Sequence, residues 1–132
     1  MIYLDACAVV KLIREEEHSA ALDTYLASTT VDMISSEVTK IEVCRTLIRH
    51  GMRDRTRQKA DTLLADIAKL PMAPLIDYAA DLGGPYLRAL DALHLATVMM
   101  LGPAVTEFIT YDKRLAKAAT EAGLPLTMPG VN

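Results

Sequence analysis

Aromatic and cysteine residues are scarce in this sequence of 132 residues, which has no tryptophan, one phenylalanine and two cysteines. Cys7 and Cys44 are too few for a disulfide scaffold, and with three scattered histidines they cannot form a structural zinc site of the usual spacing. The low aromatic content also leaves no obvious platform on which nucleic-acid bases could stack. These absences exclude disulfide-rich miniproteins and zinc fingers.

Long hydrophobic runs are absent as well. The longest uncharged run covers residues 92–106, and His94, Gly102 and Pro103 interrupt it. A membrane-spanning helix needs about 20 predominantly apolar residues, so we interpret this run as a buried helix and its exit loop. The first residues carry no basic leader, and Asp5 interrupts their apolar stretch. We therefore expect no secretory signal, no membrane partner and a cytoplasmic location.

The residues that are present predict one folded domain with an uneven charge distribution. Apolar residues make up 52% of the chain, enough to bury a core in a single domain covering residues 1–132. The formal net charge is -3, yet seven of the 14 basic residues lie in residues 40–59. A basic cluster in an acidic protein favours an anionic partner, above all nucleic acid, although a solvated helix face would have the same composition.

Short β-favouring segments alternate with segments of helical periodicity along the whole chain. This alternation predicts an α/β fold of three layers, α/β/α, in which a short parallel sheet of four to five strands has helices on both faces. The expected strands are residues 1–4, 31–34, 71–76, 108–111 and 125–128. A first helix is expected from residue 6, and the further helices are expected at residues 20–27, 36–50, 54–70, 78–82, 91–101 and 113–122.

Three aspartates lie where these predicted elements meet. Asp5 and Asp112 follow strands, and Asp91 opens a helix, so each is expected to act at least as an N-cap. Glu42 has Arg45 three residues later, so an exposed ion pair explains it equally well. Because ligand sites in such sheets lie beyond the carboxyl ends of the strands, the four acids could also converge. A carboxylate cluster of that kind suits Mg²⁺ or Mn²⁺.

Four segments resemble the PIN-domain family, and within it the VapC toxins of toxin–antitoxin pairs. Residues 2–12 (IYLDACAVVKL) resemble the family's first strand and helix, and residues 42–45 (EVCR) its helical acid. Residues 87–96 (LRALDALHLA) and 109–116 (ITYDKRLA) are similar to its two later acidic motifs. The resemblance covers nearly the whole chain, because the order, the spacing and the chain length all agree.

The resemblance implies a metal-dependent endoribonuclease toxin. Its catalytic and metal-binding residues would be Asp5, Glu42, Asp91 and Asp112, with Mg²⁺ or Mn²⁺ as cofactor. It also implies an RNA substrate, a homodimer and a cognate VapB-type antitoxin that blocks the acidic cleft.

Several further residues are predicted to support such a site. Thr110 and Cys7 are candidates for contacting the acids or the metal's water shell. Cys7 departs from the family pattern, which commonly has Ser or Thr there, and a thiol is the weaker hydrogen-bonding group. The arginines proposed to bind the RNA backbone are Arg45, Arg49, Arg53 and Arg88.

Three other functions remain open from the sequence. A phospho-receiver domain is also a small acidic α/β protein, but it needs paired acids after its first strand, and Asp5 has no acidic neighbour. A metal-dependent phosphoesterase acting on DNA or on small phosphates would use the same four acids. A catalytically inactive PIN-like module that only binds RNA or a partner would keep the fold.

Overall fold

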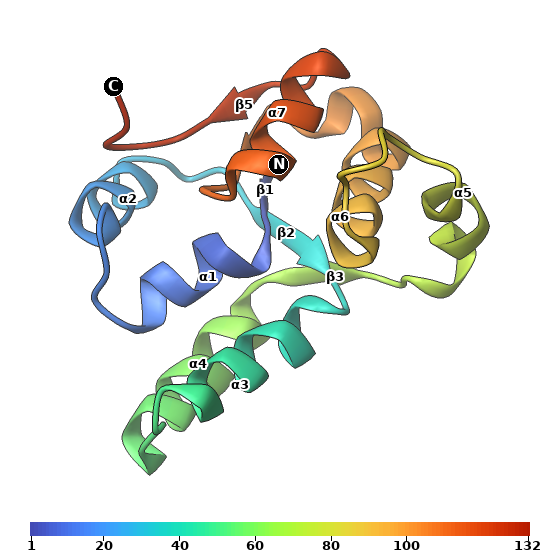
Figure 1. The fold of residues 1–132 in the computed structure, drawn as a ribbon. Coiled ribbons are helices and arrows are strands. Elements are labelled where there is room, and N and C mark those ends of the chain that lie inside the picture. The colour runs from blue at the N-terminus through green and yellow to red at the C-terminus, as the bar shows by residue number, and fades with distance from the viewer.

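A five-stranded parallel sheet forms the centre of the protein (Figure 1). The computed structural model describes all residues, 1–132. The strand order is β3-β2-β1-β4-β5. The central strand β1 (Ile2–Leu4) is fully buried between β2 (Met33–Ser36) and β4 (Glu107–Ile109), while β3 (Ala68–Leu70) and β5 (Leu126–Thr127) form the edges. An apolar β1 is what a strand covered on both faces requires.

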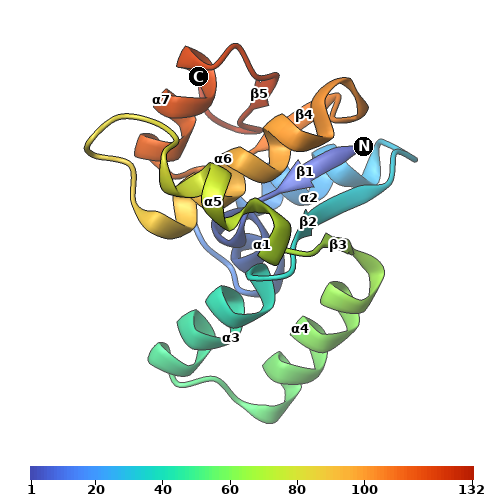
Figure 2. The same cartoon turned by 90° about the vertical axis from the view of Figure 1, so that its right-hand side faces the viewer.

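Helices cover both faces of this sheet, which confirms the predicted three-layer α/β/α architecture (Figures 1 and 2). Ile2 and Leu4 pack into one core cluster and Tyr3 into another, as the two-residue alternation of a strand requires. The first cluster includes residues of α1 (Ala6–Ile13), α2 (Ser19–Ala27), α3 (Thr39–Arg49) and α4 (Asp54–Asp66). The second includes α6 (Ala89–Leu101) and α7 (Lys113–Glu121), and α5 (Ile76–Ala80) packs on α6.

The strand predicted at residues 71–76 is wrong. Residues Ala73–Leu75 form a 3₁₀ turn that leads into α5, and Pro74 lies at its start. The third strand is instead Ala68–Leu70, which pairs with β2, so α4 ends at Asp66 and not near residue 70. Proline lacks the N–H that a strand donates, which explains why the chain leaves the sheet where the prolines begin.

Two helix starts also differ from the prediction. Ser35 and Ser36 belong to β2, so α3 begins only at Thr39. Helix α6 begins at Ala89 with Arg88 as its N-cap residue, so Asp91 lies in the first turn and is not the N-cap. The predicted caps at Asp5 and Asp112 are confirmed, because each side chain accepts a backbone N–H at the start of its helix.

The uncharged run is a buried helix, as predicted. Residues 92–98 of α6 are all buried, and α6 is followed by a short 3₁₀ turn, Gly102–Ala104. None of the helices combines the length and the apolar character needed to cross a membrane.

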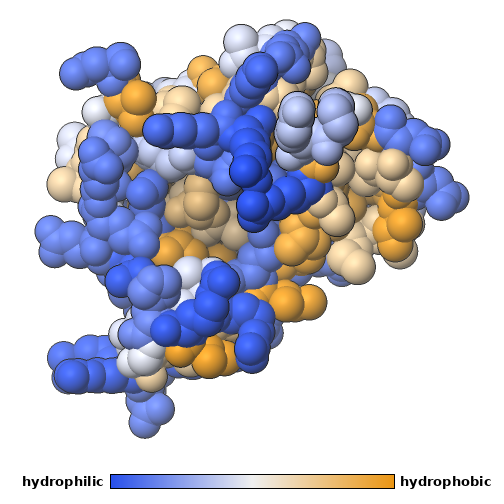
Figure 3. Space-filling model, in the orientation of Figure 1, coloured by the Kyte–Doolittle hydropathy of each residue, from blue (hydrophilic) through white to orange (hydrophobic).

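Helices α3 and α4 form a hairpin that projects below the rest of the molecule (Figures 1 and 2). Its inner face contributes Val43, Leu47 and Leu64 to the core. Its outer surface is mostly hydrophilic, with isolated apolar side chains (Figure 3). The hairpin carries the basic cluster, whereas the acids Asp5 and Asp112 lie at the end of the sheet.

Candidate active site

Asp5 and Thr110 lie side by side because β1 and β4 end together. Leu4 is paired with Ile109 in the parallel register, so the next residue of each strand emerges at the same end of the sheet. We call this side, where the carboxyl ends of the strands lie, the acidic edge. Both side chains are buried, and Asp5 is only 3% exposed. A carboxylate at such a position needs hydrogen-bond donors, because burial without them is costly.

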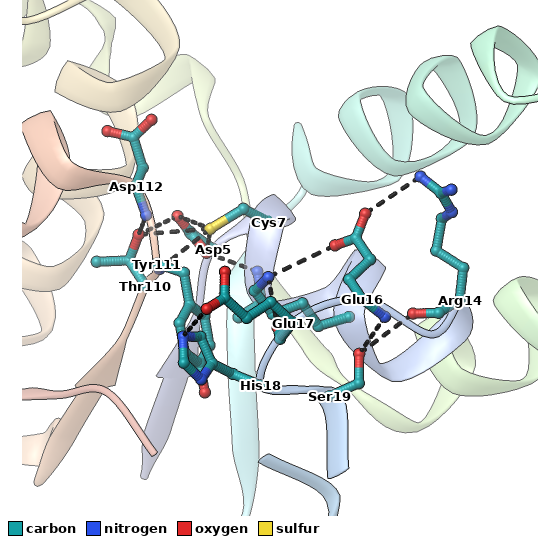
Figure 4. Close-up of polar contacts among 12 residues, drawn as sticks. Asp5, Cys7, Arg14, Glu16, Glu17, His18, Ser19, Thr110, Tyr111 and Asp112 are labelled. Carbon is teal, nitrogen blue, oxygen red and sulfur yellow. Dashed lines mark hydrogen bonds and ion pairs between the residues drawn. The ribbon is translucent and has the colours of Figure 1, made fainter. Parts of the chain in front are cut away.

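Asp5 has three such donors (Figure 4). The Thr110 hydroxyl donates to one carboxylate oxygen, the Cys7 thiol lies 3.0 Å and 3.1 Å from the two oxygens, and the Ala8 backbone N–H donates over 3.0 Å. Burial still raises the pKa of Asp5 above its usual value, although nearby His94 and these hydrogen bonds lower it in part. Burial and the Asp5 charge also raise the pKa of Cys7, so its thiol stays protonated and can donate.

Glu42 is held from the neighbouring helix α6. Its Oε1 lies 2.7 Å from Nε2 of His94, and Nδ1 of the same ring lies 2.7 Å from the hydroxyl of Tyr3 on β1. The exposed ion pair that the sequence suggested for Glu42 is not formed, because no arginine lies within ion-pair distance of it. The Glu42 side chain keeps 21% exposure, so it is reachable from solvent.

Asp112 begins α7 beside this edge. Its Oδ1 accepts the Leu115 backbone N–H over 2.9 Å, and its own N–H donates to the Thr110 hydroxyl oxygen over 3.1 Å. In Figure 4 its carboxylate points away from Thr110 and Asp5. The cap therefore fixes where the Asp112 carboxylate lies, and Thr110 links Asp112 to Asp5.

Asp91 indicates that the four acids share one region. Burial raises its pKa above the usual value, and the charges of Asp112, Asp5 and Glu42 raise it further, while His94 lowers it. Repulsion of this kind weakens with distance, so it indicates that the four carboxylates lie in one partly buried region, without bringing three of them within metal-ligating distance.

The donor set suits a hard divalent cation, since it consists of carboxylate oxygens that mutual repulsion makes ready to accept positive charge. The side chains do not form a closed cage, because no three acidic, histidine or cysteine side chains come together closely enough to hold a metal ion. The hydrogen bonds explain this spacing: Asp5 and Asp112 are each held as helix caps, and Glu42 is held by His94.

The arginines predicted to bind RNA are not gathered into the acidic edge. All four are exposed. Arg45 and Arg49 lie on α3, Arg53 is the N-cap residue of α4, and Arg88 is the N-cap residue of α6. Arg45 follows Glu42 by three residues, and Arg88 precedes Asp91 by three residues.

Two features were not singled out from the sequence. His94 stood out in the sequence only as an interruption of the uncharged run, whereas in the structure it contacts Glu42, which lies 52 positions away. Tyr86 is 84% exposed and lines a hollow of about 410 Å³ together with Arg114 and Lys117, so one aromatic ring is available for stacking after all. The apolar pattern of α6 gave no signal for the contact of His94 with Glu42, and an isolated tyrosine in the loop before α6 gave none for the exposed ring of Tyr86.

Comparison with known proteins identifies the family. The model of the PIN domain family matches residues 2–121. The chain belongs to the PIN domain family. The match decides against the receiver-domain alternative, and the five-stranded parallel sheet described above is that of a single PIN domain.

Named relatives of this PIN domain come from Mycobacterium tuberculosis. The chain is 34% identical to "Ribonuclease VapC47" over 98% of both chains, and 36% identical to "Ribonuclease VapC35" over 98% of both. It is also 36% identical to "Ribonuclease VapC46" over 97% of both chains. The resemblance to VapC proteins is thereby confirmed across nearly the full length.

A solved structure has the same fold. The crystal structure of Mycobacterium tuberculosis VapC20, described as a Sarcin-Ricin loop cleaving toxin, superimposes with a TM-score of 0.74. The match covers 94% of this chain and 96% of that one at 16% sequence identity. At that identity the likeness establishes the fold alone.

Proposed function

We propose that this PIN domain is a metal-dependent endoribonuclease toxin that hydrolyses RNA phosphodiester bonds. The observation that carries the proposal is the placement of the acids: Thr110 hydrogen-bonds both Asp5 and the backbone of Asp112, and Glu42 is held by His94, which lies three residues after Asp91 on α6. These are the acids on which the resemblance was based, and the full-length relatives are named ribonucleases. A purely structural role does not account for this grouping, because repulsion between neighbouring carboxylates lowers the stability of the fold.

The residues proposed to hold Mg²⁺ or Mn²⁺ are Asp5, Glu42, Asp91 and Asp112. A divalent ion supplies Lewis-acid chemistry: it lowers the pKa of water and neutralises the charge that grows on the phosphate during hydrolysis. The protein's part is orientation. Thr110 and Cys7 fix the Asp5 carboxylate, and the α7 cap fixes that of Asp112.

RNA would approach over the exposed arginines. Arg53 lines, with Arg14 and His50, a basic hollow of about 180 Å³ at the connection between α3 and α4. Arg45 and Arg49 follow on α3, and Arg88 begins the helix that carries Asp91. Contacts of this kind bind phosphate without selecting a sequence, so we propose them for affinity only.

Inhibition by a VapB-type antitoxin and assembly as a homodimer belong to the same proposal. An edge with four acids would attract a basic antitoxin segment. Copurification with the antitoxin encoded beside this chain, followed by light scattering of the toxin alone, tests both. A chain that stays monomeric would contradict the homodimer, and RNA cleavage that is unchanged by the antitoxin would contradict the inhibition.

The proposed activity is tested with purified protein, total bacterial RNA and Mg²⁺. We expect new RNA ends in the presence of Mg²⁺, none with EDTA, and none with Asp5→Asn. Parallel assays on single-stranded DNA and on bis(p-nitrophenyl) phosphate test the phosphoesterase alternative. Asp5→Asn protein that is folded and cleaves RNA at the normal rate would contradict the assignment of the site, and cleavage of DNA alone would contradict the substrate class.

A further inference from the structure

The buried histidine of α6 connects the sheet to an acid on another helix. His94 is 1% exposed, and both of its ring nitrogens are within 2.7 Å of a partner, Tyr3 on one side and Glu42 on the other. Tyr3 is itself fully buried, and its ring packs edge-on against both His94 and Phe108. The three side chains therefore form a chain of contacts from the most buried strand to the candidate site.

The direction of these hydrogen bonds follows from the chemistry of the partners. A carboxylate only accepts, so Nε2 of His94 donates to Glu42. In the neutral ring, Nδ1 then accepts the proton of the Tyr3 hydroxyl; in the cation, Nδ1 donates to the Tyr3 oxygen. In both forms the tyrosine sets the position of the ring, and the ring presents an N–H to Glu42.

Glu42 needs such a partner more than Asp5 and Asp112 do. Asp5 and Asp112 are short side chains, and each is fixed by a backbone N–H of its own helix. Glu42 lies in the first turn of α3, has a longer and more flexible side chain, and accepts no backbone N–H. His94 follows Asp91 by three residues on α6, so the two lie on neighbouring positions of one helix face. The contact therefore turns Glu42 toward the helix that carries Asp91.

We propose that His94, anchored by Tyr3, is a positioning residue that holds the Glu42 carboxylate in place for the divalent ion. This inference rests on the proposed function, because it assumes that Glu42 is a ligand. Residues that orient metal ligands through a hydrogen bond commonly change metal affinity by about 10- to 100-fold when they are removed.

Two substitutions separate positioning from simple packing. In His94→Gln the terminal amide nitrogen lies three bonds from Cβ, as Nε2 does, so it can still donate to Glu42. In His94→Asn the amide lies two bonds from Cβ, as Nδ1 does, so it can reach Tyr3 but not Glu42. Both side chains are smaller than histidine and polar. Because Asn is one methylene smaller than Gln, a role in packing alone predicts losses that follow the thermal midpoints of the two variants, whereas positioning predicts a loss of Mn²⁺ affinity in His94→Asn beyond the change in its thermal midpoint.

The experiment measures Mn²⁺ affinity by calorimetry, the thermal midpoint by circular dichroism and the rate of cleavage of total bacterial RNA. We expect His94→Asn to bind Mn²⁺ about 10- to 100-fold more weakly than the unchanged protein, with a parallel loss of rate, and His94→Gln to restore most of both. Gln58→Asn, which shortens an exposed polar side chain of α4 by one methylene, is the matched control and should alter neither.

The outcomes distinguish this inference from the function on which it rests. If Glu42→Gln abolishes Mn²⁺ binding while His94→Asn binds normally, the positioning role is wrong and the proposed function stands. If Glu42→Gln binds Mn²⁺ and cleaves RNA normally, Glu42 is not a ligand, and the positioning role of His94 is wrong as well. Equal losses in the two His94 variants that follow their thermal midpoints would also overturn the positioning role.

A second variant covers the case in which neither His94 variant folds. Tyr3→Phe keeps the ring and its contact with Phe108 and removes only the hydroxyl that anchors His94. Weaker Mn²⁺ binding by folded Tyr3→Phe supports the proposal, and unchanged binding contradicts it.

Discussion

The acidic edge of the sheet and the basic α3–α4 hairpin differ in how their charged side chains are held. At the edge, Asp5 and Asp112 accept N–H groups of the helices they begin, and Glu42 is tied to a buried histidine. On the hairpin the arginines are mostly exposed, and the one that forms an ion pair is Arg57, whose Nε lies 3.0 Å from Oδ1 of Asp61.

This difference fits the two functions that we propose for these regions, catalysis at the acidic edge and RNA binding on the hairpin. Catalysis by carboxylates depends on geometry, because a ligand displaced by a fraction of an ångström changes how charge is stabilised in the transition state. Binding of a phosphate backbone depends mainly on charge and tolerates mobile side chains. We therefore expect the edge to be sensitive to every substitution and the hairpin to be sensitive only to changes in its net charge.

The largest effect on stability should come from the core under the edge. Phe108→Ala removes a fully buried ring between Tyr3 and the helices α6 and α7, and should cost about 3–5 kcal/mol of unfolding free energy. Leu64→Ala on the inner side of the hairpin should cost about 2–3 kcal/mol, the lower part of the range for such changes. Urea unfolding monitored by circular dichroism measures both, and a larger loss for Leu64→Ala would reverse the comparison.

The next largest effect should be on RNA cleavage. Asp91→Asn removes the carboxylate whose pKa the other three acids raise. This change should lower the cleavage rate at least about 100-fold, a size typical of losing one electrostatic group in an active site. Arg53→Glu on the hairpin should leave the rate at saturating RNA within a few-fold. A larger loss of that rate for Arg53→Glu than for Asp91→Asn would contradict the division of work.

The sequence predicted those parts of these two regions whose structure is set by a local pattern, and it missed those set by long-range contacts. Asp5 could be placed because an apolar run that becomes a strand ends at it, and α6 because residues 92–98 are almost continuously apolar. The strand Ala68–Leu70 could not be predicted, since it continues the pattern of α4 and becomes a strand only by pairing with β2.

The candidate site shows the same limit. The order and spacing of the four acids predicted that they converge, but their hydrogen bonds depend on the tertiary arrangement. Thr110 reaches Asp5 across 105 positions of the sequence, and His94 reaches Glu42 across 52. No local periodicity encodes either contact, and Asp91 could be taken for an N-cap because helices often begin with aspartate.

Salt dependence tests the hairpin itself. Reversing Arg53, Arg55 and Arg57 to Glu should weaken RNA binding and flatten its dependence on salt, by about 0.7 in the logarithmic slope for each phosphate that the variant no longer neutralises. The control exchanges Arg57 and Asp61, which keeps the net charge of the hairpin and should leave the slope unchanged. A slope that the triple reversal does not alter would remove the hairpin from the RNA interface.

The smallest effect should appear in the pH dependence of stability. Because the pKa of Asp91 is raised in the folded protein, the folded state holds this proton more tightly than the unfolded state does. Stability therefore falls as pH rises from the unfolded value, about 3.9, through the folded value. In EDTA, Asp91→Asn should gain thermal midpoint relative to the unchanged protein as pH rises from about 3 to 7, whereas a constant difference would contradict mutual repulsion.

The most direct test of the shared acidic site is calorimetric titration with Mn²⁺ of the unchanged protein and of Asp5→Asn, Glu42→Gln, Asp91→Asn and Asp112→Asn. We predict measurable binding by the unchanged protein and a marked loss in each variant, including Glu42→Gln on α3. Normal binding by any one of these variants in folded form would show that the four acids do not act together.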